Sequence, residues 1–207
     1  MSAEKFLKEA IRNLEFNLKK INKRLPSTKP TPLSSVYRPE IDVSAPLDND
    51  YVNWYQKLIG TLCWAVELGQ IDIHLSVALL AQYLVQPRAG HLEQVFHIFA
   101  YLKGDLRSKI FLDPCKPSVD ETYFIKADWS EFYPESSEAI PLNAPEPRGN
   151  DVIVSCFADA DHAGNLVTHQ SHTGLIIFCN RAPILWFSKH QNTVETSTFR
   201  SAILQLN

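Results

Sequence analysis

Two proline-rich segments divide the sequence, and they constrain its fold more than any other feature. Residues 26–46 contain five prolines, and residues 134–147 contain four more. Because proline lacks a backbone N–H and fixes φ, neither segment can form a continuous helix or a central strand. We therefore expect five parts in chain order: an amphipathic basic helix (1–25), a proline-rich connector (26–47), a helical unit (48–106), short strands with an acidic, proline-rich linker (107–150), and a β-rich region (151–207).

The helical parts are predicted from periodic apolar residues and clear stop signals. In the first segment, apolar residues recur at steps of four and three, and Ser2 is available as an N-cap. Three further helices are expected over 51–68, 71–86 and 91–103. They stop at Gly69, Pro87 and Gly104, respectively, residues that commonly end or follow helices.

The β-rich region contains three apolar runs: VIVSCFADA from Val152, TGLIIFCN from Thr173 and APILWFSK from Ala182. Turn-forming residues separate the runs, which predicts an antiparallel meander. Two short strands are expected upstream, over 109–112 and 123–127, and residues 196–207 have the apolar spacing of a final helix. The expected fold class is therefore α+β.

Composition and charge narrow the class of protein. The hydrophobic content of 45% is enough for a core, which excludes a wholly disordered chain. The four cysteines lack CxxC spacing, the N-terminus is charged, and no apolar run reaches the roughly 18 residues of a membrane span. We expect an intracellular protein without membrane association, and the sequence does not distinguish cytoplasm from nucleus.

Two aspartates, Asp159 and Asp161, end the first apolar run. If the strand continues through them, both carboxylates face the same side, because side chains alternate along a strand. Carboxylates are ligands that Mg²⁺ prefers. The alternative is an ordinary acidic exit from a strand into a turn, and the sequence alone leaves both interpretations open.

Several segments resemble, in matching order, the Pol polyprotein of copia-type retrotransposons. YQKLIGTLCWAVELGQIDI is similar to the stretch that follows the polymerase palm, and HLEQVFHIFAYLKG to the next helix. FADADHAG resembles the opening strand of that family's ribonuclease H domain. SHTGLIIF and APILWFSKHQNTVETSTF resemble its second and third strands and the approach to its first helix. The resemblance implies a thumb-like or connection-like helical unit followed by a truncated ribonuclease H-like fold, with a three-stranded antiparallel meander and a first helix.

The resemblance also implies a metal chemistry that this chain carries incompletely. Ribonuclease H enzymes hold two metal ions, Mg²⁺ in this family, with a cluster of carboxylates, and they act on RNA:DNA hybrids. Asp159 matches the first ligand, and Asp161 has a secondary place in the same motif. The acidic positions of the first helix fall on Arg200 and Ala202, whereas Glu195 precedes that helix. Further ligands would lie beyond Asn207. We therefore expect no tightly bound cofactor and only weak Mg²⁺ binding at Asp159.

The polymerase part has a corresponding gap, because the paired-aspartate palm motif of the family does not occur in this sequence. A complete enzyme could contact template phosphate through the basic residues of the first segment, although for this chain we favour a solvated helix face. These residues are Lys5, Lys8, Arg12, Lys19, Lys20 and Lys23.

Three functions are compatible with these features. The first is a retrotransposon remnant without autonomous catalysis, and we favour it. The second is a reverse transcriptase or ribonuclease H module completed by other chains. The third is a module co-opted to bind nucleic acid or protein. A truncated sheet would also expose one edge of residues 152–157. Either residues 109–112 or 123–127 then pair beside that strand, or the protein associates with itself.

Overall fold

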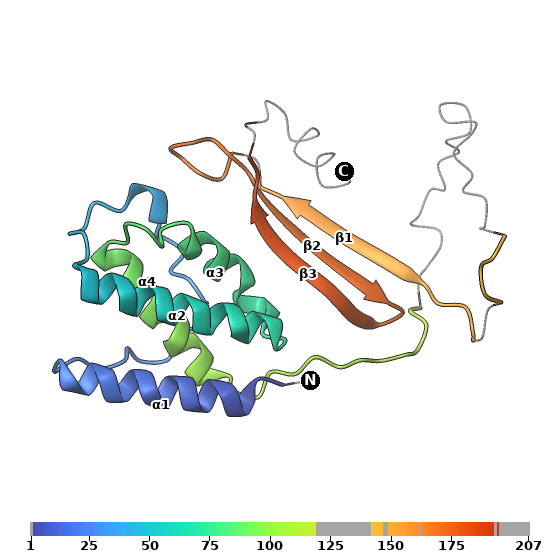
Figure 1. The fold of residues 1–207 in the computed structure, drawn as a ribbon, viewed down its shortest axis with the longest axis horizontal. Helices are drawn as coiled ribbons and strands as arrows, with labels where there is room; N and C mark the ends of the chain where they lie inside the picture. Colours follow the sequence, from blue (N-terminus) through green and yellow to red (C-terminus); the bar gives the residue numbers. More distant parts are fainter. Residues whose placement is uncertain (1, 119–141, 147–148, 162, 193, 195–207) are drawn as a thin grey trace.

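The computed structural model describes residues 2–118, 142–146, 149–161, 163–192 and 194. In this part of the chain, four α-helices precede a three-stranded sheet (Figure 1). This arrangement confirms the predicted α+β class. The predicted strand over 123–127, the predicted final helix over 196–207, and Glu195, Arg200 and Ala202 lie outside the described residues.

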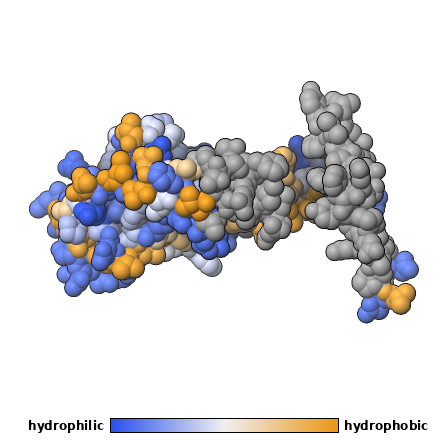
Figure 2. Space-filling model, turned by 90° about the horizontal axis from the view of Figure 1, so that it is seen from above, coloured by the Kyte–Doolittle hydropathy of each residue, from blue (hydrophilic) through white to orange (hydrophobic). Residues whose placement is uncertain are grey.

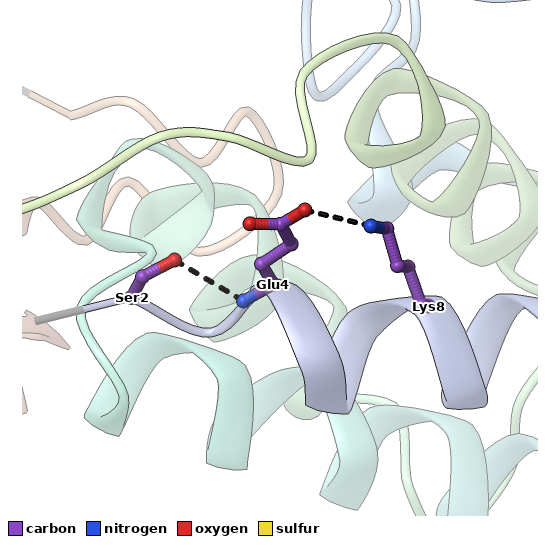
Figure 3. Close-up of polar contacts among 3 residues, drawn as sticks. All are labelled: Ser2, Glu4 and Lys8. Atoms are coloured by element: carbon purple, nitrogen blue, oxygen red, sulfur yellow. Dashed lines mark hydrogen bonds and ion pairs between the residues drawn. The ribbon is translucent and has the colours of Figure 1, made fainter.

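Helix α1 (Glu4–Lys20) forms where the apolar periodicity predicted it. Its buried side is a single stripe of Leu7, Ile11, Leu14 and Leu18, which packs against α2 and α4. The N-cap is Ala3 rather than Ser2. The Ser2 hydroxyl nevertheless accepts a hydrogen bond from the Glu4 N–H (3.3 Å), and Glu4 pairs with Lys8 one turn later (2.7 Å; Figure 3).

The connector after α1 lies along the helical unit and contains one 3₁₀ turn, η1 (Pro39–Ile41). Its hydrogen bonds reach the start of α4. Arg88 donates to the Ser44 carbonyl oxygen (2.6 Å), and the Ala89 N–H donates to the Ala45 carbonyl oxygen (2.9 Å). The proline-rich composition therefore prevents regular structure here without preventing ordered packing.

The helical unit consists of α2 (Asn49–Glu67), η2 (Ile71–Ile73), α3 (His74–Ala81) and α4 (Ala89–Gly104). Asp48 caps α2 by accepting the Tyr51 N–H (2.9 Å), and Gly69 follows the helix with φ 105°. In the core, the buried Tyr55 hydroxyl donates to the Leu80 carbonyl oxygen (2.7 Å). The Tyr55–Leu80 bond joins α2 to α3, and both helices pack with α4 around one apolar centre that also includes the buried stripe of α1.

The prediction of one continuous helix over 71–86 was wrong. The segment begins as the 3₁₀ turn η2, and α3 ends at Ala81, five residues before the expected end. Beyond that point Leu84 lies outside any helix, and its carbonyl oxygen accepts a hydrogen bond from the Gln56 side chain of α2 (2.9 Å). Tertiary hydrogen bonding overrides the local helical pattern at this end.

The sheet consists of β1 (Val154–Ala160), β2 (His172–Cys179) and β3 (Ala182–His190), paired antiparallel in that order. This confirms the predicted meander. Asn180, with φ 54°, supplies the left-handed residue of the tight β2–β3 turn. In the register, Asp159 lies opposite Gly174.

The predicted strand over 109–112 was wrong, because these residues have no regular structure. Ile110 is buried, whereas Phe111 and Leu112 are exposed. A four-residue apolar run is too short to identify a strand unless a partner pairs with it. This part of the chain instead reaches the β2–β3 turn, where Asp113 pairs with Arg181 (3.1 Å) and the Pro114 carbonyl oxygen accepts from Asn180 (2.8 Å).

The sheet contacts the helical unit through β3. Trp186 of β3 packs against the helical core, and β3 lies nearest to the helices while β1 forms the far edge (Figure 1). Figure 2 shows hydrophilic residues over much of the helical end of the molecule, with hydrophobic ones between them. None of the described helices is long and apolar enough to cross a membrane.

Candidate functional site

An open groove of about 740 Å³ lies between the start of α3 and the sheet face that carries both predicted aspartates. The 3₁₀ turn η2 and α3 contribute Asp72, His74 and Leu75. All three strands contribute the opposite wall, and its lining includes Phe157, Asp159, Asp161, His172, Ile176 and Trp186. The groove therefore brings together carboxylates, imidazoles and aromatic side chains.

Asp159 belongs to the exposed part of β1 and makes no hydrogen bond through its carboxylate within the described residues. Its cross-strand neighbour is Gly174. Because glycine has no side chain, the sheet surface beside the carboxylate stays open. The Asp159 carboxylate is therefore accessible from the groove.

Asp161 has a different environment, although the sequence placed it in the same motif. Its carboxylate accepts the backbone N–H of His172 in a short hydrogen bond. Its own N–H donates to the His172 carbonyl oxygen (3.2 Å). These reciprocal contacts close the β1–β2 loop, so Asp161 holds the loop in place.

The residues after Asp161 support this structural role. Ala163 has φ 52°, and its N–H donates to the Ser171 hydroxyl (3.1 Å) across the loop. A Cβ added at Gly164 would collide with the Asp161 carboxylate. Gly164 therefore lies close to the Asp161 carboxylate, and these contacts favour the exit from a strand into a loop that the sequence left as the alternative.

A group of histidines, not predicted from the sequence, lies at the same end of the groove. His172 is only 6% exposed, and among the described residues neither of its ring nitrogens has a hydrogen-bond partner. The His190 ring lies 6.1 Å from it, centroid to centroid. Burial lowers the pKa of His172; the Asp161 carboxylate opposes that shift, while His190 and His74 add to it. Burial therefore favours the neutral form of His172.

The third groove carboxylate, Asp72, is committed to contacts within the helical unit. Its two oxygens accept hydrogen bonds from the Tyr101 hydroxyl (2.6 Å) and the Gln70 amide (3.0 Å). Across the described ranges, no three His, Cys, Asp or Glu side chains are placed to hold a metal ion together.

The six predicted basic residues are all exposed. Lys8 pairs with Glu4, and the Lys20 ammonium lies 4.4 Å from the centre of the Phe16 ring. Lys23 lies beyond the end of α1, after Asn22, which has φ 55°. Glu9 and Glu15 share the exposed surface with Arg12 and Lys19. The surface therefore carries both signs of charge.

The described architecture is that of an α+β chain whose helical unit packs beside an antiparallel meander with a carboxylate on its first strand. The chain is 25% identical over 144 residues to the retrovirus-related Pol polyprotein from transposon RE1 of Arabidopsis thaliana, covering 70% of this chain and 7% of that protein. It is 23% identical over 189 residues to a putative transposon Ty5-1 protein of Saccharomyces cerevisiae, covering 91% of this chain and 47% of that protein.

A third relative is the retrovirus-related Pol polyprotein from transposon TNT 1-94 of Nicotiana tabacum, 24% identical over 70% of this chain and 8% of the relative. No family model matches the chain, and no solved structure matches it significantly. The chain thus spans less than half the length of each of these relatives. Its curated homologues are copia/Ty-type retrotransposon Pol polyproteins, which confirms the resemblance predicted from the sequence.

Proposed function

We propose that this chain derives from the reverse transcriptase and ribonuclease H region of a copia-type Pol polyprotein and has no catalytic activity by itself. The observation that carries the proposal is the length of the match to the Ty5-1 protein. Any stretch of 189 residues in a chain of 207 includes residues 19–189. The similarity therefore runs through the helical unit and the meander up to Lys189, including Asp159, rather than resting on one motif.

The contacts in the groove support the inactive interpretation. Phosphoryl transfer by two metals needs several carboxylates that converge on the ions. Asp161 is bonded to the β1–β2 loop and Asp72 to Tyr101, which leaves Asp159 as the groove carboxylate without a described hydrogen bond. One carboxylate competes poorly with the hydration shell of Mg²⁺.

The sequence supports the same interpretation at the two positions where the resemblance implies acids. Arg200 carries a positive charge, and Ala202 has no polar atom in its side chain. Neither residue binds a cation. The palm motif of the polymerase is also missing from these 207 residues.

Primer extension tests the polymerase half of the proposal. The purified chain is incubated with a primed RNA template, deoxynucleotides, and Mg²⁺ or Mn²⁺, beside a heat-denatured sample. We expect no extension above that control. Metal-dependent extension that persists through further purification would overturn the proposal and favour a working polymerase module.

Binding to nucleic acid is a separate question, which a salt titration addresses. If the exposed basic residues of α1 contact phosphate, affinity for an RNA:DNA hybrid will fall steeply as salt rises. A matched variant with Lys19→Gln, Lys20→Gln and Lys23→Gln would then show a shallower salt dependence. An unchanged slope would assign these residues to the solvated helix surface.

A further inference from the structure

The outer edge of β1 is the most distinctive surface outside the groove. In the described sheet, β1 pairs with β2 on one side and has no strand on the other. The helical unit packs beside β3, at the opposite edge (Figure 1). A strand from another molecule could therefore approach β1 without meeting the helices.

The hydrogen bonds of the sheet show which backbone groups point outward. The Asn180 N–H donates to the Ile153 carbonyl oxygen (2.7 Å), and the Asp161 N–H donates to that of His172 (3.2 Å). Because backbone groups alternate along a strand, the odd-numbered residues from 153 to 161 bond β2. The even-numbered residues therefore point their N–H and C=O groups away from the sheet: Val154, Cys156, Ala158 and Ala160.

The charged residue of β1, Asp159, bonds β2 through its backbone, and three features that commonly prevent strands from pairing between molecules are missing along this edge. Edge strands are commonly protected by lysine, proline or a bulge. The outward-pointing residues are uncharged and contain no proline, and the β1 register runs without a bulge. Val154 and Phe157 are 66% and 59% exposed, respectively, so apolar surface accompanies the unpaired backbone.

We propose that β1 pairs antiparallel with β1 of a second copy of this chain, with Cys156 opposite Cys156 at the two-fold axis. In that register Val154 faces Ala158 of the other copy, and every outward N–H from 154 to 158 meets an outward C=O. A second copy always carries the same uncharged, outward-pointing residues. An antiparallel pair of identical strands is related by a two-fold axis, so the same edge serves both partners. One strand pair buries less than about 1,200 Å², so the dimer is weak and concentration-dependent.

Hydrogen exchange on the full chain at rising concentration tests the proposal directly. The amides of Ser155, Phe157 and Asp159 bond β2 and should be protected at every concentration. The amides of Cys156 and Ala158 should exchange quickly in dilute protein and become protected as the concentration rises. Protection of these two amides already in a dilute monomer would overturn the proposal, because the chain would then cover its own edge.

Sedimentation equilibrium of variants tests the register. Cys156→Lys places like charges opposite each other and should weaken the dimer about fivefold or more. Mixing it with Cys156→Glu should restore association. Cys63→Lys, the same change at an exposed site on α2, is the matched control and should have no effect. A monomer at all concentrations, or a dimer indifferent to Cys156→Lys, would overturn the proposal. Circular dichroism verifies that each variant folds. If a variant unfolds, hydrogen exchange on the unaltered chain decides whether β1 pairs between copies.

Discussion

Replacing Asp161 tests the assignment of this carboxylate to the β1–β2 loop. In Asp161→Ala, the backbone N–H of His172 loses its acceptor, and His172 is only 6% exposed. Water therefore reaches that N–H poorly. A buried donor left without a partner costs about 1–3 kcal/mol, and loss of a charged acceptor places the change toward the upper part of that range.

Asp159→Ala is the matched control, since it removes a carboxylate two residues earlier on the same strand. Asp159 makes no carboxylate hydrogen bond in the described part of the chain, so we expect a change in unfolding free energy within about 0.5 kcal/mol. Asp161→Asn keeps an acceptor oxygen and should lose less stability than Asp161→Ala.

Urea unfolding followed by circular dichroism measures the three variants, and hydrogen exchange at the His172 amide localises the effect. We expect faster exchange there in Asp161→Ala and wild-type exchange in Asp159→Ala. Equal stability of the two alanine variants, or greater loss in Asp159→Ala, would refute the structural role of Asp161.

Further predictions concern the buried histidines and the helical core. Because the pKa of His172 is lowered in the folded state, the unfolded chain binds its proton first as pH falls. Stability should be full above about pH 6.5 and decline through the folded-state pKa, by up to about 1.4 kcal/mol per pH unit; His172→Leu should flatten this decline in pH-dependent unfolding. His74 and His97, whose pKa values burial also lowers, contribute with the same sign. Tyr55→Phe should cost about 1 kcal/mol in urea unfolding by removing the bond to Leu80, whereas Tyr51→Phe, whose hydroxyl has no described hydrogen bond, should cost less.

The parts of the fold that could be predicted from sequence are those with long periodic patterns and clear stops. The apolar stripe from Leu7 to Leu18 predicted α1, and Gly69 predicted the end of α2. The structure has both features where they were expected. The meander followed from three apolar runs separated by turn residues. The helix expected over 71–86 ends early where Leu84 bonds the Gln56 side chain, and the short run over 109–112 has no strand beside it among the described residues; in both segments tertiary contacts decide the structure.

The candidate site was only partly predictable. Asp159 could be placed on the opening strand, because alternation and strand length are properties of the local sequence. The role of Asp161 depends on a backbone N–H eleven residues later, which no local pattern indicates. The burial of His172 and its contact with His190 depend on β2–β3 register.

Cleavage of an RNA:DNA hybrid is the most direct test of the proposal that the chain has no catalytic activity by itself. A hybrid labelled on its RNA strand is incubated with the purified chain and Mg²⁺ or Mn²⁺, beside the Asp159→Asn variant and a chelated sample. We expect wild type and variant to leave equal amounts of intact RNA, both indistinguishable from the chelated sample. Reproducible metal-dependent cleavage by the wild type that Asp159→Asn abolishes would contradict the proposal, and would show that other carboxylates complete a working site around Asp159.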